Sequence, residues 1–421
     1  MAGARGKVAL VYDSASITPL EIAEAARPVC DLVWLLDYSD PMLSPLLPLI
    51  RRLGGMIDTG GRSVEAVVAD LAATDPSGVF TFAERQMPLA AGIAAAFGFP
   101  YFSTDTAALL ANKYRQRLAL AAAGVPGPRF WPVSAGDAGT IDALASELPF
   151  PVVLKPQVGT GSRDTTLVED FESMKAAFDG VDEQAGDMLI EELLVEARAP
   201  NERVFGETLM VDSMVMSGRA SHFVVCGHFI PAPPFRGAGS FAPSQYDAAQ
   251  LSAVYDATDA AIAALGIEHG LTNTDLIYTP DGPRVLEVNG RIGGDVHTLI
   301  EMAGGAAVLP EVFRFAAGEE DVGIAPLHSA QVAFSINQQA PMDAVRLLAL
   351  NGLEETSALP GVSRIVPHRS PGDSVDWRIG TRSRIATIYG VAGGHDELRE
   401  LHTEIERCLS PEYEFAEPSH P

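Results

Sequence analysis

The sequence contains few cysteines, few basic residues and no long apolar run. The three cysteines lie far apart and are odd in number, so they predict neither a disulfide framework nor a zinc site. Only 29 basic residues stand against 55 acidic ones, a net charge of −26, which argues against nucleic acid as a partner. No stretch approaches the roughly 18 apolar residues of a membrane span, and the apolar segment near the N-terminus is too short for a signal peptide. We therefore expect a cytoplasmic protein with no membrane partner.

The chain is rich in apolar residues, which make up 47% of its 421 positions. This is enough for several cored domains without a disulfide or metal staple. Short apolar runs at 7–12, 32–36 and 78–82 are separated by Ala-rich segments of helical length, a pattern typical of parallel strands with crossover helices. Residues 1–103 are therefore expected to form an open α/β domain, and a single helix is expected over residues 104–123.

The rest of the chain mixes strands and helices in a way that predicts α+β structure. A hairpin turn is expected at Ser217-Gly218 and another at Pro280-Asp281-Gly282. The expected strands are 151–155, 165–168, 188–194, two within 203–226, 271–278, 284–288, 330–336 and 385–389, and the expected helices are 244–265 and 395–408.

A glycine-rich loop after an expected strand is the first motif that could bind a ligand. The strand ends at Lys155, and Thr160, Gly161 and Ser162 follow in the loop. Such a loop exposes backbone N–H groups that can wrap a polyphosphate, and the lysine adds a point charge. It is not a Walker A loop, because no Gly-Lys-Ser/Thr closes the turn, and it is not a dinucleotide fingerprint, because Asp164 stands where a third glycine would fall. An ordinary hairpin turn with a surface lysine would give the same pattern.

Three unlike polar residues at alternate positions form the second motif. In one strand Glu287, Asn289 and Arg291 would project from the same face, and Asp275 in the preceding strand could reach that face. Two carboxylates and an amide make a hard oxygen site suited to Mg²⁺ that is held partly by phosphates and water. The two glycines that follow favour close approach of a ligand, although a solvated edge hairpin is the alternative.

In this order the motifs resemble those of the ATP-grasp superfamily, and the chain is similar to the bacterial L-amino-acid ligases, which are carboxylate-amine ligases that form dipeptides. The resemblance covers about residues 112–318 and adds Lys113 at the start of its helix as a further ATP-binding lysine. It implies an ATP-grasp fold. The implied domains are an N-terminal open α/β (pre-ATP-grasp) domain at 1–103, ATP-grasp subdomains at 104–186 and 187–320, and a C-terminal α+β domain at 321–421.

The resemblance also implies a role for each motif residue. The residues implied in ATP binding are Lys113, Lys155, Thr160, Gly161 and Ser162, with Glu191, Glu192 and Leu194 at the adenine hinge. The implied ligands of two Mg²⁺ ions, for which Mn²⁺ can substitute, are Asp275, Glu287 and Asn289. The implied catalytic residues are Arg291 and Lys155, and the implied substrate contacts are Arg291, Gly293, Gly294 and Ser240. The glutamate implied in ribose binding is Glu196 or Glu202.

The chain departs from the dipeptide-forming relatives at one substrate element. Their Glu-x-Gly-His-x-x-Pro pattern corresponds here to residues 237–243, where Gly237 replaces the glutamate and Ser240 the histidine. A basic residue near Asp376-Trp377-Arg378 resembles one that closes over the substrate in the C-terminal domain of such ligases. The amino-acid specificity is therefore left open.

The activity that the resemblance implies is an ADP-forming ligation of an amino-acid carboxylate to an amine through an acyl phosphate. Small amino acids or amines are the expected partners, and a homodimer is allowed. Two alternatives stay open: an ATP-grasp enzyme with another acceptor, such as a γ-carboxylate amide ligase, a cyclo-ligase or a carboxylase, and a nucleotide-binding protein without catalysis.

Overall fold

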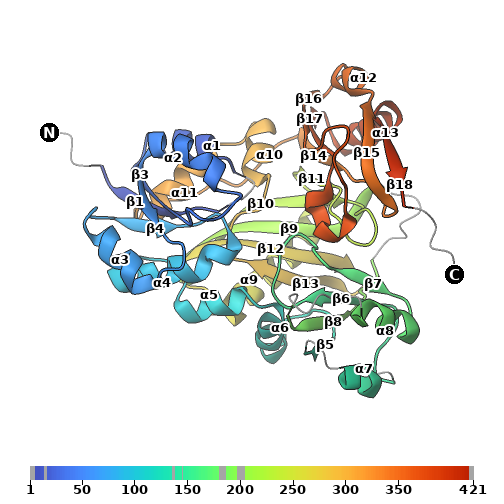
Figure 1. Ribbon diagram of the computed structural model, residues 1–421, viewed down its shortest axis with the longest axis horizontal. Helices are drawn as coiled ribbons and strands as arrows, with labels where there is room; N and C mark the ends of the chain where they lie inside the picture. Colours follow the sequence, from blue (N-terminus) through green and yellow to red (C-terminus); the bar gives the residue numbers. More distant parts are fainter. Residues whose placement is uncertain are drawn as a thin grey trace.

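A computed structural model gives the structure of residues 5–13, 17–134, 138–144, 146–179, 186–196 and 204–416. The strands of the described residues form four sheets, and Figure 1 shows the N-terminal sheet on one side, with the largest sheet extending toward the C-terminal strands on the other side, several of which belong to it. The described part of the chain contains no helix that is long and apolar enough to cross a membrane.

The N-terminal part is a parallel sheet with crossover helices, as the apolar runs predicted. The strands are β1 (Lys7–Val11), β2 (Asp31–Leu36), β3 (Gly55–Asp58) and β4 (Gly78–Phe80), in the order β3-β2-β1-β4. The helices are α1 (Pro19–Ala26), α2 (Leu47–Leu53), α3 (Val64–Ala72) and α4 (Met87–Phe97), with 3-10 turns η1 (Ser44–Leu46) and η2 (Glu84–Gln86). β3 was not predicted, because its four residues are only half-buried or exposed and so form no apolar run.

The single helix expected over 104–123 is wrong. The chain forms α5 (Thr104–Leu110) and α6 (Lys113–Ala122), because Asn112 has an extended backbone and its side chain accepts a hydrogen bond from the N–H of Arg115. Asparagine is a favourable N-cap, so it can start a new helix within an apolar helical pattern. The break places Lys113 at the first position of α6, where its N–H donates to the carbonyl of Gln157.

A second, antiparallel sheet carries the glycine-rich loop. Its strands are β5 (Phe130–Val133), β8 (Met188–Glu192), β6 (Val152–Pro156) and β7 (Thr166–Val168), in that order, with α7 (Ala138–Leu144) and α8 (Phe171–Asp179) beside them. β8 ends at Glu192, two residues earlier than predicted. β5 was not expected, because it is largely half-buried and contains a proline.

The largest sheet has eight antiparallel strands and extends from the predicted metal hairpin to the C-terminal part. Its order is β13 (Gly282–Asn289), β12 (Gly270–Thr279), β9 (Phe205–Met216), β10 (Arg219–Phe229), β11 (Gly239–Ala242), β14 (Val332–Gln338), β17 (Ala386–Ala392) and β16 (Val362–Pro367). Both predicted hairpin turns are confirmed. A separate two-stranded sheet pairs β15 (Ala344–Asn351) with β18 (Ser410–Phe415).

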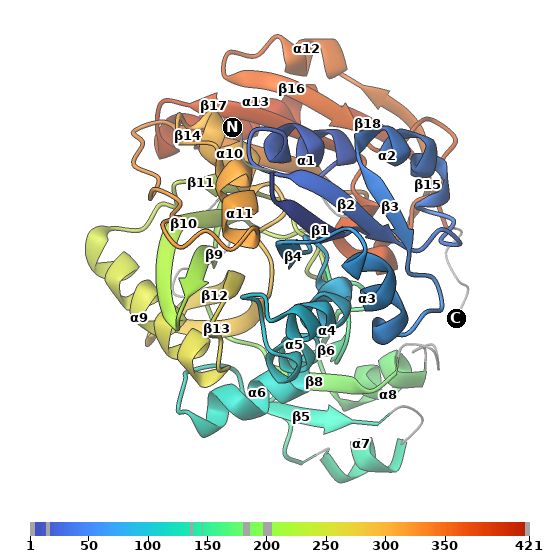
Figure 2. The ribbon, with the colours of Figure 1, turned by 90° about the vertical axis from the view of Figure 1, so that its left-hand side faces the viewer.

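Helices cover this sheet and connect it to the N-terminal part. They are α9 (Ala248–Ala264), α10 (Val296–Met302), α11 (Val308–Ala316), α12 (Leu353–Ser357), α13 (His395–Cys408) and the 3-10 segment η5 (Trp377–Ser383). Figures 1 and 2 both show α1 lying beside α10 and α11. One continuous cluster of buried apolar side chains joins β1, β2 and β4 to β9, β12 and α11, so the N-terminal sheet packs firmly on the central one.

Candidate functional site

The predicted metal ligands lie together on the β12–β13 hairpin. Asp275 and Glu287 are cross-strand partners, and the side-chain amide of Asn289 donates to Asp275 at 3.1 Å. Burial raises the pKa of Asp275 to about 7, and the nearby charge of Glu287 acts in the same direction. The hairpin therefore concentrates negative charge and oxygen ligands at one point.

Arg291 reaches this group, although not from the strand as predicted. β13 ends at Asn289, and Arg291 lies two residues beyond it. Its guanidinium lies 3.4 Å from the amide oxygen of Asn273 and 3.6 Å from a carboxylate oxygen of Glu84 on η2. The chain turns here at Gly290, where a Cβ atom would lie 2.3 Å from the sulfur of Met87, so a larger residue would force Met87 to shift.

The two predicted lysines face the hairpin from α6 and β6. Lys113 Nζ lies 2.8 Å from Glu287 Oε1 and donates to the carbonyl of Gly159 in the glycine-rich loop at 2.5 Å. Lys155 Nζ lies 2.6 Å from Glu191 Oε2. Burial lowers the pKa of Lys155. In Lys113 burial also acts to lower the pKa, but the charge of Glu287 raises it. Both lysines are thus ionically paired near the predicted metal ligands.

Glu191 has a side-chain role that the hinge interpretation did not include. Its carboxylate lies between Lys155 and Arg117, whose Nε donates to Glu191 Oε1 at 2.5 Å. Burial alone would raise the pKa of Glu191, but these two cations lower it to about 2. Arg117 also donates to the carbonyl of Val285 on β13, so this buried ion cluster ties α6, β6, β8 and β13 together.

The other hinge residues lie at the end of β8. Glu192 pairs with Arg129 at the surface, with 3.2 Å between Oε2 and Nε. Leu194 lies two residues beyond the end of β8, the strand between β5 and β6, and it is half-buried. Of the two glutamates considered for ribose, Glu196 accepts a hydrogen bond from the N–H of Glu207 at 3.4 Å, whereas Glu202 lies outside the described residues. Adenosine binding here stays a prediction.

The glycine-rich loop lies against η5. The Thr381 N–H donates to the carbonyl of Gly161 at 2.9 Å, and the Asp164 N–H donates to the carbonyl of Arg378 at 3.1 Å. At Gly380, with φ of 69°, a Cβ atom would lie only 2.1 Å from the Gly161 oxygen. The segment around Arg378 that was expected to close over the substrate therefore contacts the loop, and the Arg378 guanidinium itself pairs with Asp376 at 3.3 Å.

Thr160 and Ser162 lie beside Gly161 in this loop. Ser162 has a positive φ of 57°, and Gly161 one of 67°. Residues other than glycine rarely adopt positive φ, so these values show that the chain turns tightly between β6 and β7, where the loop is exposed. This geometry fits the predicted phosphate-binding loop.

Two buried carboxylates that the sequence did not single out support the predicted substrate residues. Asp212 on β9 accepts hydrogen bonds from the Gly293 N–H at 2.6 Å and from the Asn273 amide at 2.9 Å. Burial raises the pKa of Asp212 to about 7, and burial also raises that of Glu84. A lone aspartate in an apolar strand was the available signal for Asp212. Glu84 follows an apolar strand end and gave no distinct pattern.

Gly293 and Gly294 lie beside this carboxylate group, whereas Ser240 lies farther along the same sheet. A Cβ atom at Gly293 would lie 3.2 Å from Asp212, so the backbone approaches closely there, and Gly294 is half-buried beside it. Ser240 lies on β11 opposite His228 and Ser335. Because β9 and β10 separate β11 from β12, the structure brings Gly293 to the hairpin group and does not bring Ser240 there.

The oxygen ligands on the β12–β13 hairpin are suitable for an Mg²⁺ ion that is bound together with a nucleotide. Within the described ranges, no three His, Cys, Asp or Glu side chains are grouped to hold a metal ion. The donors of the hairpin are two carboxylates and one amide, all of them oxygen ligands that Mg²⁺ accepts. Mg²⁺ keeps several waters and is usually completed by substrate phosphates, so this incomplete protein set fits a nucleotide-bound ion.

Comparison with known proteins defines the class of this chain. Residues 110–295 match the ATP-grasp domain family. The chain therefore contains a segment that matches the ATP-grasp domain, and it has the ATP-grasp fold.

Individual relatives cover most of its length. The chain is similar to the L-arginine-specific L-amino acid ligase of Bacillus subtilis, with 22% identity over 72% of this chain and 72% of that protein. The L-amino acid ligase of Bacillus licheniformis superposes with a TM-score of 0.76 and 19% identity over 98% of this chain and 100% of that one. The N5-carboxyaminoimidazole ribonucleotide synthetase of Thermotoga maritima does so with a TM-score of 0.69 and 16% identity over 97% of this chain and 100% of that one. These two structures share the fold of this chain, and they are different enzymes.

Proposed function

We propose that the protein uses ATP to join an amino-acid carboxylate to an amine, with ADP, phosphate and an amide as products. The observation that carries this proposal is the meeting of Lys113, Lys155, Arg291 and the Asp275–Glu287 pair at one place. Phosphoryl transfer needs little covalent chemistry from a protein, because positioning and charge neutralisation supply most of the rate. This group of side chains can supply both the positioning and the charge neutralisation.

Each residue has a distinct part in the proposed reaction. Lys113 and Lys155 hold the phosphates, and the loop at Thr160, Gly161 and Ser162 covers them with backbone N–H groups. Arg291 stabilises charge on the transferred phosphoryl group and afterwards on the tetrahedral oxyanion.

The metal ligands complete the site. ATP-grasp proteins generally bind ATP with Mg²⁺, which would neutralise phosphate charge in this site. We propose that two Mg²⁺ ions bind here and that Asp275, Glu287 and Asn289 would hold them. No side chain acts as nucleophile, because the substrate carboxylate attacks the terminal phosphorus and the amine then attacks the acyl phosphate.

The substrate wall supports an amino acid that is not held there by an ion pair. At Gly237 the space next to the backbone is taken by Thr381, whose side-chain oxygen accepts the Gly237 N–H at 3.0 Å. With Ser240 in the same element, the wall has neither a carboxylate nor an imidazole of its own. We therefore propose that one substrate is bulkier than alanine or lacks a free α-amine at this wall, as suits a building block of specialised metabolism.

A substrate screen tests the function. Phosphate release is measured over pairs of amino acids and amines, and the spent nucleotide is separated by chromatography. ADP with an amide product is expected, whereas AMP with pyrophosphate would exclude the acyl-phosphate reaction. Strict preference for alanine with a second simple amino acid would contradict the proposed pocket, and phosphate release that needs bicarbonate would favour a carboxylase.

A further inference from the structure

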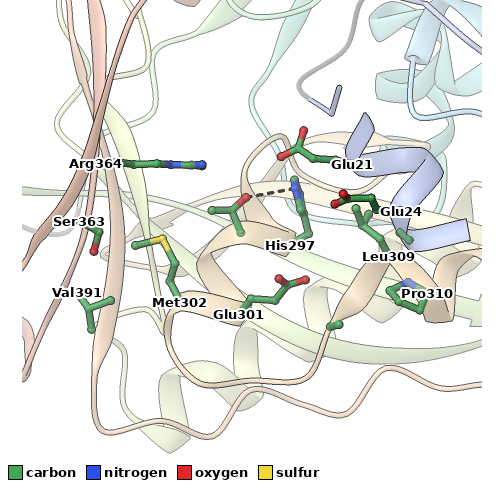
Figure 3. A pocket seen from close by; sticks show the side chains of 13 residues that line it. Glu21, Glu24, His297, Glu301, Met302, Leu309, Pro310, Ser363, Arg364 and Val391 are labelled. Carbon is green, nitrogen blue, oxygen red and sulfur yellow. Dashed lines mark hydrogen bonds between the residues drawn. The ribbon is translucent and has the colours of Figure 1, made fainter. Parts of the chain in front are cut away.

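A pocket lies away from the β12–β13 hairpin, at a place where three parts of the chain meet. It has a volume of about 620 Å³ and is bounded by α1 of the N-terminal sheet, by α10 and the start of α11, and by β16 and β17 (Figure 3). This volume is in the range of small-molecule sites, roughly 300–1,000 Å³. None of the residues predicted to bind ATP, metal or substrate lines it.

Carboxylates dominate the polar lining of this pocket. Figure 3 shows Glu21, Glu24 and Glu301 around the imidazole of His297, with Arg364 extending toward them from β16. Three carboxylates and one guanidinium leave a net charge of about −2 if the imidazole is neutral. The walls between them include apolar side chains of Ala25, Met302, Leu309, Pro310 and Val391.

Within the described ranges, none of the three carboxylates forms an ion pair, although the charges of His297 and Arg364 act to lower the pKa of Glu21. Glu21 Oε2 accepts hydrogen bonds from the N–H and hydroxyl of Thr18, which fix the first turn of α1. The side chains of Glu24 and Glu301 have no hydrogen bond or ion pair to any residue in the described ranges. Burial and the nearby charge of Glu21 raise the pKa of Glu301, as expected for a carboxylate that faces another carboxylate.

His297 independently indicates that this pocket binds a ligand. The residue is only 6% exposed, its Nε2 lies 3.2 Å from the Thr298 hydroxyl, and its buried Nδ1 has no hydrogen-bond partner among the residues that the structure describes. Buried polar atoms are nearly always hydrogen-bonded, so an unpaired one calls for a partner from outside the chain. A neutral imidazole whose Nε2–H donates to Thr298 keeps a lone pair on Nδ1, which accepts a hydrogen bond from an ammonium group.

We propose that this pocket binds a small aliphatic molecule with two cationic amino groups, either a diamine or a basic amino acid. One ammonium group would contact Glu24 and Glu301, the other Glu21 and Nδ1 of His297, and the aliphatic chain would lie on the apolar wall. If the ligand carries a carboxylate, Arg364 is its partner, which distinguishes the two kinds of molecule. Because the pocket is built from α1, α10 and β16, the ligand would join the N-terminal and C-terminal parts.

The proposal does not depend on the reaction and is tested by binding. Isothermal titration of the full-length protein with cadaverine, lysine and norleucine compares two ammonium groups, two ammonium groups with a carboxylate, and one ammonium group with a carboxylate. Saturable binding of cadaverine or lysine, at least tenfold tighter than norleucine, is expected. Glu301→Gln should weaken that binding at least tenfold, whereas Glu172→Gln on the exposed face of α8 should leave it unchanged.

Two further variants separate this pocket from the active site. Glu287→Gln should retain diamine binding, because Glu287 belongs to the predicted metal site on the β12–β13 hairpin and does not line this pocket. Arg364→Gln should weaken binding of lysine and leave that of cadaverine unchanged if the natural ligand is an amino acid, and should weaken neither if it is a diamine. The proposal is overturned if no cation binds saturably at millimolar concentration, if norleucine binds as well as the dications, or if Glu287→Gln rather than Glu301→Gln abolishes binding.

Discussion

Replacement of Glu191 by glutamine tests whether the buried ion cluster stabilises the site. Burial alone would raise the pKa of this carboxyl, but Arg117 and Lys155 lower it from 4.5 to about 2. Such a fall corresponds to about 3 kcal/mol of folding free energy. Removing one member of a buried ion pair typically costs roughly 3–5 kcal/mol, because the remaining charge stays buried without a partner. We therefore expect Glu191→Gln to lower the free energy of unfolding by about 3 kcal/mol at neutral pH.

The adjacent residue provides a matched control. Glu192 pairs with Arg129, whose side chain is 60% exposed, and such surface pairs contribute less than about 1 kcal/mol. Urea denaturation of both variants and the parent protein, analysed with a common dependence on denaturant, gives the two losses. A loss below about 1 kcal/mol for Glu191→Gln, or equal losses for the two variants, would refute the reasoning.

The pH dependence provides a second check on the same prediction. The folded-state pKa of Glu191 lies below its ordinary value of 4.5, so its stabilising contribution is complete above that pH and is lost as the pH falls toward about 2. The difference in stability between the parent protein and Glu191→Gln should therefore be constant near neutral pH and shrink in acid. A difference that persisted at the acid limit would mean that packing, not charge, is the cause.

Three further predictions concern the proposed reaction. Glu287→Gln should reduce turnover on the order of a thousandfold with the fold intact, and near-normal rates at saturating Mg²⁺ would place Glu287 outside the metal site. Lys155→Ala should weaken ATP binding and slow turnover together, because the lysine contacts phosphates in both ground and transition states; an unchanged KM for ATP in steady-state assays would contradict this. Gly380→Ala should speed proteolysis of the glycine-rich loop and raise the KM for ATP, whereas Gly372→Ala, also at positive φ but with open space around its Cβ position, should not.

The sequence predicted local structure well where one signal dominated. The hairpin turn at Ser217-Gly218 and the helix at 395–408 are confirmed, because turn residues and helical periodicity act over short distances. The break at Asn112 was missed, since a capping side chain competes with an uninterrupted helical pattern. Contacts between distant elements, such as that of Asp212 with Gly293, leave no trace in periodicity.

The hairpin residues show the same division at the level of the site. Alternation placed Glu287 and Asn289 correctly relative to Asp275, because all three lie on paired strands. It placed Arg291 on a strand that in fact ends two residues earlier, and it could not show that Glu191 lies between two cations. Whether a strand lies inside a sheet or at its edge depends on neighbours that are remote in sequence.

The pairing of Lys113 with Glu287 has a consequence for the order of events in binding. In the proposed site, a phosphate bound by Lys113 and a metal ion bound by Glu287 would each compete with the ion pair between these two side chains. Binding of either one would weaken the pair and make the other side chain more available. By thermodynamic reciprocity, whatever factor Mg²⁺ adds to the affinity for ATP would be the factor that ATP adds to the affinity for Mg²⁺. If the proposed roles hold, the ion pair favours the metal–nucleotide complex over either component alone.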